Sequence, residues 1–121
     1  MDVTFDHNGI KITILNGAYL QDGRPTDRAV SDYKGLIAQL NELKSFAAHR
    51  LLQLYNKTWV DDETGEVDCE GFVSRLGKPS IHLYDELGAA VVYFDVGNLF
   101  AGHLIEVHVE NGVPTHAGII G

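Results

Sequence analysis

Histidine is the residue type in this sequence with the widest chemical range, and two of the six histidines fall where they could act together. His82 and His108 take the polar phase of two expected strands, and Glu106 shares that phase with His108. If those strands are neighbours, this set could bind zinc or a small ligand, or serve a small enzyme. No compact ligand spacing such as HxxxH or CxxC accompanies them, so a solvated sheet face is the simpler explanation. We therefore expect no metal and no cofactor.

Motifs of well-known enzyme classes are absent from the sequence, which contains no GxGxxG, GxxxxGK[ST], GxSxG or HExxH. The single cysteine, Cys69, has acidic neighbours on both sides, and these disfavour a nucleophilic role. His103 follows Gly102 without an evident partner, which favours a structural role over that of a catalytic base. We therefore predict no catalytic residue, and a non-enzymatic protein is favoured.

Acidic residues dominate the charge of the chain, with 17 Asp and Glu against 9 Lys and Arg and a net charge of -8 at pH 7. This balance disfavours nucleic acid and anionic membranes as partners, and it favours a basic protein. The simpler explanation is that the charge keeps the protein soluble. The sequence shows no signal peptide and no apolar run of membrane-spanning length, and one cysteine fits a reducing compartment, so we expect a cytoplasmic protein. These features are also compatible with a homodimer.

The densest charge feature is Asp61–Glu70 (DDETGEVDCE), which carries no basic residue. It is not an EF-hand loop, because Gly65 at the sixth position would place Val60 at the first. Either it is a solvated acidic loop, or it docks a basic protein together with the aromatic residues just upstream. The partner-binding hypothesis names Tyr55, Trp59, Asp61, Asp62, Glu63 and Glu66.

Alternating apolar residues predict the strands that would position these groups. Asn8-Gly9 and Asn111-Gly112 are typical of tight hairpin turns, and they lie near the two ends of the chain. The expected strands are Asp2–Asp6, Ile10–Leu15, Ser80–Tyr84, Ala89–Phe94, Leu104–Val109 and Thr115–Ile120.

The centre of the chain is predicted to be helical, because apolar residues recur at helical spacing from Tyr33 to Tyr55. Thr26 can cap this region, and its length favours two helices, with Ser45 as a candidate cap of the second. A short third helix is expected from Asp68 to Leu76, and a loop is expected over residues 16–25.

The order ββ-α-α-α-ββββ predicts one α+β domain over residues 1–121, with an antiparallel sheet of about six strands and helices packed on one face. Along the expected strand Leu104–Val109 and just beyond it, Glu106, His108 and Glu110 would face away from the helices, toward solvent or a partner. The expected core includes Leu40, Phe46, Leu51, Ile105 and Val107.

About half of the chain resembles small bacterial cytoplasmic proteins of the domain-of-unknown-function type. The residues that carry the resemblance are Phe72–Leu76, Ser80–Tyr84, Leu99–Val107 and Ile119–Gly121, with Leu54-Tyr55-Asn56 and Trp59 upstream. Some proteins of that kind resemble immunity proteins, which neutralise toxins inside the producing cell. The resemblance implies a binding module and carries over no catalytic residue.

The sequence therefore supports two hypotheses of different classes. The leading one is a non-catalytic acidic binding protein, with toxin immunity as its specific form. The alternative is a metal-binding or small-ligand-binding protein, or a small enzyme, that uses the sheet face of His82, Glu106 and His108.

Overall fold

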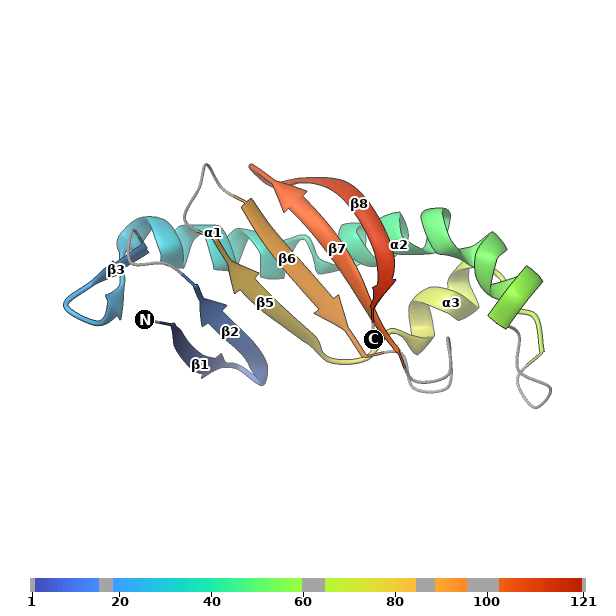
Figure 1. Cartoon of the computed structure of the whole chain (residues 1–121), viewed down its shortest axis with the longest axis horizontal. Helices are drawn as coiled ribbons and strands as arrows, with labels where there is room; N and C mark the ends of the chain where they lie inside the picture. Colours follow the sequence, from blue (N-terminus) through green and yellow to red (C-terminus); the bar gives the residue numbers. More distant parts are fainter. Residues whose placement is uncertain (1, 16–18, 60–64, 85–88, 96–102, 121) are drawn as a thin grey trace.

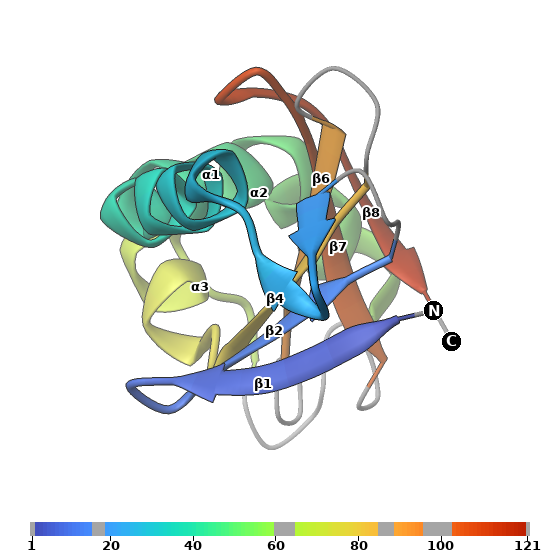
Figure 2. The ribbon, with the colours of Figure 1, turned by 90° about the vertical axis from the view of Figure 1, so that its left-hand side faces the viewer.

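A computed structural model of the chain describes residues 2–15, 19–59, 65–84, 89–95 and 103–120 (Figure 1). It has a sheet layer and a helix layer, and Figure 2 shows the helices on one face of the sheet. The elements are β1 (Val3–His7), β2 (Ile10–Ile14), β3 (Leu20–Gln21), β4 (Arg24–Pro25), α1 (Asp27–Ala38), α2 (Leu40–Leu54), the π-helical turn η2 (Tyr55–Trp59), α3 (Cys69–Arg75), β5 (Pro79–Leu83), β6 (Ala89–Phe94), β7 (Leu104–Glu110) and β8 (Val113–Ile120).

The main sheet has six strands in the order β1-β2-β5-β6-β7-β8, which confirms the predicted α+β class. Four of its neighbouring pairs are antiparallel, but β2 and β5 run parallel, so the sheet is mixed. The exception has a topological cause. The chain leaves β2, passes through the whole helix layer and re-enters the sheet beside β2, and such a crossover is what a parallel pair requires.

Both predicted Asn-Gly turns are confirmed, with Asn8 at φ 53° and Asn111 at φ 50°, each followed by a glycine of positive φ. This left-handed pair is the geometry of a tight hairpin turn. Asp22 and Gly23 adopt the same conformation and join β3 to β4. The prediction of a loop throughout 16–25 is therefore wrong for this hairpin, whose Asp-Gly pair is itself a turn signal.

The predicted helix caps are present. The Thr26 hydroxyl accepts a hydrogen bond from the Ala29 amide at 3.2 Å, and Asp68 accepts one from the Gly71 amide at 2.7 Å. The central region forms two helices, but the break is at Gln39, and Ser45 lies inside α2. The Gln39 side chain donates to the Gly112 carbonyl at 2.7 Å, so the break coincides with a contact to the β7–β8 turn.

The core lies between the helices and the facing side of the sheet. One cross-strand row contributes side chains with 0% exposure from four successive strands: Ile12, Ile81, Val92 and Val107. The helix layer covers this row with Leu36, Leu43, Ala47, Leu51 and Phe72. Of the expected core residues, Leu51, Ile105 and Val107 are buried, whereas Leu40 and Phe46 are only partly buried. Phe46 lies at the margin, where the Arg50 guanidinium sits 4.7 Å from its ring centre.

Two adjacent residues of β7 test which face of the sheet packs against the helices. Ile105 is 0% exposed and Leu104 is 40% exposed, because successive side chains point to opposite faces. Ile105→Ala is expected to lower the free energy of unfolding by about 2–5 kcal/mol, and Leu104→Ala by much less. Urea denaturation of the two variants measures both losses. Equal losses would show that the assignment of faces is wrong.

Candidate functional site

The described helices lie on one side of the main sheet and leave its opposite face uncovered (Figure 2). We call it the open face. Cross-strand pairing places in one row on it His82 of β5, Val91 of β6, His108 of β7 and His116 of β8. The neighbouring row contains Asp6, Lys11, Ser80, Tyr93, Glu106 and Gly118.

Side chains of the open face pack against one another. The ring of His82 meets that of Tyr93 edge-on at 4.8 Å between centroids, and the rings of His108 and His116 are 5.4 Å apart. Val91 lies beneath these rings with only 5% exposure, although no described helix covers it. The open face is therefore an ordered layer of side chains.

Burial keeps two of these groups in their neutral forms. Burial is the largest cause that lowers the pKa of His82, and the positive charge of Lys11 adds to it, while Asp2 acts in the opposite direction. Burial also raises the pKa of Tyr93, with further contributions from Tyr84, which hydrogen-bonds it, and from the charge of Glu106. Both shifts favour the neutral forms of His82 and Tyr93 at neutral pH.

A hollow of about 320 Å³ lies at one end of the open face. Its lining includes Tyr84, Val91, His108, Glu110 and His116. The hollow therefore combines an apolar base, aromatic walls and one carboxylate, which is the composition of a pocket for an anchoring side chain.

The alternative ligand set, His82, Glu106 and His108, shares the open face but does not converge. Glu106 and His108 are 3.3 Å apart, between Oε1 and Nε2. His82 is separated from His108 by the whole of β6, with Val91 between them, a distance of about 10 Å at normal strand spacing. Among the described residues, no three His, Cys, Asp or Glu side chains form a group that could hold a metal ion.

The partner-binding residues expected from the sequence fall in three situations. Tyr55 is 0% exposed, with its hydroxyl 3.5 Å from the Gly65 carbonyl, so its expected role in partner contact is corrected to one in core packing. Trp59 is partly buried and meets the His103 ring at 5.6 Å, whereas Glu66 is exposed. Asp61, Asp62 and Glu63 lie outside the described residues.

The Asn56 side chain of η2 also contacts the segment that contains Glu66. The amide of Asn56 donates to the Val67 carbonyl at 2.9 Å and accepts from the Val67 amide at 3.0 Å. This two-point contact resembles a strand pairing and fixes the backbone on either side of Val67. The backbone that carries Glu66 is therefore anchored to η2.

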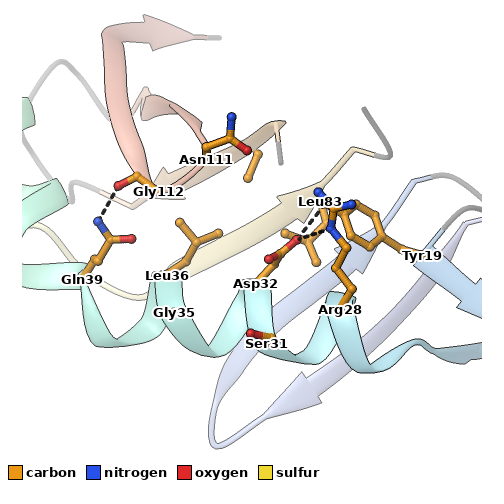
Figure 3. A pocket seen from close by; sticks show the side chains of 11 residues that line it. Tyr19, Arg28, Ser31, Asp32, Gly35, Leu36, Gln39, Leu83, Asn111 and Gly112 are labelled. Atoms are coloured by element: carbon orange, nitrogen blue, oxygen red, sulfur yellow. Dashed lines mark hydrogen bonds and ion pairs between the residues drawn. The ribbon is translucent and has the colours of Figure 1, made fainter. Parts of the chain in front are cut away.

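A second hollow, of about 210 Å³, lies between α1 and the β7–β8 turn (Figure 3). At one end the Tyr19 hydroxyl donates to Asp32 Oδ2 at 2.8 Å, and Arg28 Nε is 3.8 Å from the same oxygen. At the other end Gln39 binds the Gly112 carbonyl. We call this hollow the α1 pocket. Sequence reasoning did not identify it, because its residues are spread over a helix, a loop, two strands and a turn.

The fold and these surfaces define a small α+β protein with one sheet face left open. The chain belongs to the DUF2262 family, described as an uncharacterized protein conserved in bacteria, whose family model matches residues 3–119. This confirms the bacterial domain-of-unknown-function part of the resemblance. No curated protein and no solved structure matches the chain. In the described part of the chain, no helix combines the length and apolar character needed to cross a membrane.

Gly35 lines the α1 pocket in the middle of α1, and it gives the first prediction for this site. A Cβ built on Gly35 has no heavy atom within 4 Å, apart from its own helix backbone and neighbours. Gly35→Ala is therefore expected to raise the free energy of unfolding by about 1 kcal/mol. The control Gly112→Ala should lower it, because Gly112 has φ +80°. Loss of stability in Gly35→Ala, measured in urea, would contradict the open geometry at this position.

His82 makes stability depend on pH. Its folded-state pKa is below the ordinary value of 6.5, so the unfolded chain takes up the proton first as the pH falls. The stability that His82 contributes is fully present above pH 6.5 and is lost as the pH falls toward the folded-state pKa. His82→Gln is expected to lose less stability on acidification than the wild type. Urea denaturation above and below pH 6.5 measures this, with the exposed His116→Gln as control; equal losses in His82→Gln and wild type would refute the assignment.

Proposed function

We propose that this protein is a non-catalytic binding protein that takes a basic surface of another protein on its open face. Its specific form in this proposal is an immunity protein that neutralises a toxin in the bacterial cytoplasm. The observation that carries the proposal is the ordered layer of aromatic and histidine side chains on a sheet face without a covering helix.

The composition of the open face supports a protein partner. Tyr84 and Tyr93 offer aromatic contact area with polar tips, and Leu104 is 40% exposed at the same face. Aromatic side chains of this kind contribute much of the binding energy at interfaces. Because the rings already pack on one another, binding would require little further ordering of side chains, which favours affinity.

The charges around this layer support a basic partner. Asp6, Glu106 and Glu110 lie on the open face, where Lys11 is the basic residue that opposes them within the described strands. The whole chain carries a net charge of -8, which attracts basic proteins at long range. In this proposal Asp61, Asp62 and Glu63 steer the partner, and the open face holds it.

The experiment uses the protein encoded by the gene next to this one, in an inactivated form if it is toxic. Surface-binding kinetics at low and high salt are measured for Glu106→Gln/Glu110→Gln. The expected result is a loss of affinity of about tenfold, or about 1.4 kcal/mol, and a weaker dependence on salt. The matched control is Asp27→Asn/Glu42→Gln, which neutralises two exposed carboxylates of the helix layer and should bind as the wild type does.

A second variant separates steering from contact. Asp61→Asn/Asp62→Asn/Glu63→Gln is expected to slow association and to leave dissociation unchanged, since steering charges act on the encounter. Equal affinities of the open-face variant and its control would place the interface elsewhere. If the neighbouring gene product does not bind at all, the immunity proposal fails, and binding of a small ligand at Glu106 and His108 becomes the next candidate.

A further inference from the structure

The α1 pocket has the features of a small-molecule site on a surface separate from the open face (Figure 3). Its base is apolar, with Leu36, Leu83 and Ala90 among the lining residues. Its volume of about 210 Å³ is below the roughly 300–1,000 Å³ of pockets that take drug-sized ligands. A ligand must therefore be about as small as a single amino acid.

The charged end of the pocket carries both signs side by side. Asp32 uses Oδ2 for both of its described contacts, to Tyr19 and Arg28, so Oδ1 can accept from a ligand. The side chain of Arg28 is 66% exposed and has donors beyond the Nε that approaches Asp32. An exposed pair of this kind contributes little to stability. It is, however, complementary to a ligand that carries an ammonium and a carboxylate group.

The wall formed by α1 between Asp32 and Gln39 leaves room for the apolar part of such a ligand. Asp32 of α1 and Gln39, which directly follows α1, are seven residues apart, a span of about 10 Å along the helix axis. Gly35 lies between them, and the space where its Cβ would stand is open. A glycine inside a helix is destabilising relative to alanine, and no contact in the described structure requires one here. A ligand that approaches the helix backbone at this point would account for Gly35.

We infer that the α1 pocket binds a small zwitterion with an apolar body, of which a free amino acid such as L-leucine is the representative. The ammonium group binds Asp32, the carboxylate binds Arg28, and the side chain covers Leu36 and Leu83 above Gly35. This site is independent of the proposed protein interface, and its test needs no protein partner.

The probes are three molecules with the same apolar body: L-leucine, L-leucinamide and 4-methylpentanoate. Leucinamide lacks the carboxylate and 4-methylpentanoate lacks the ammonium group, so only L-leucine can use both charges. Isothermal titration of the full chain should give binding of L-leucine, and affinities at least about tenfold weaker for the other two, since each loses a charge-assisted contact. The other standard amino acids, tested in the same way, should rank by how well they fit the pocket.

Variants assign the site. Asp32→Asn and Arg28→Gln are made as two single variants, and each should weaken L-leucine binding about tenfold or more. Asp32→Asn keeps an acceptor for the Tyr19 hydroxyl. Asp27→Asn, on α1 outside the pocket, should leave binding unchanged. Gly35→Ala should weaken binding while it raises the melting temperature, a combination that general loss of structure cannot produce.

Three results would overturn the inference. One is the absence of binding by L-leucine and every other standard amino acid to a wild-type protein with a normal melting transition. Another is equal binding of L-leucine and L-leucinamide, which would define a site for amines alone. The third is unchanged L-leucine affinity in both Asp32→Asn and Arg28→Gln. None of these outcomes bears on the open face, so the two proposals stand or fall separately.

Discussion

One-sided burial of the sheet is the constraint on which the rest of this structure depends. The row from Ile12 to Val107 is sealed against the helices, and successive residues of a strand point to opposite faces. Burying Ile105 and Val107 therefore forces Glu106 and His108 outward. A shift of pairing by one residue would exchange the two faces, so the packing of the core also fixes the composition of the open face.

Local signals in the sequence predicted much of the fold because they act over a few residues. Asn-Gly favours the left-handed turn of a tight hairpin, and Thr26 and Asp68 cap helices with their own side chains. The break between α1 and α2 was misplaced because Gln39 has no helix-ending signal of its own. Its side chain contacts Gly112, 73 residues away, and contacts of that separation leave no trace in a local pattern. The parallel pairing of β2 with β5 is missed for the same reason.

The candidate sites were predictable only in part. Strand phase correctly grouped His82, Glu106 and His108 on one face, but phase does not reveal which strands are neighbours, and β6 separates the histidines. Tyr55 carries the apolar spacing of a helix face, which fits the core at least as well as a docking surface. The α1 pocket could not be found in the sequence, because Asp32, Gly35 and Asn111 line one pocket only when α1 lies against the β7–β8 turn.

The crossover between β2 and β5 has a consequence for the order in which the fold assembles. The strands β5 to β8 are neighbours in the sheet in their order along the chain, so each of their pairings closes a short loop. The pairing of β2 with β5, which includes Ile14 and Leu83, closes a loop that contains the whole helix layer. Closing a long loop costs more chain entropy and slows the step that requires it. We therefore expect the β5–β8 meander to form first and the β1–β2 hairpin to pair with it late in folding.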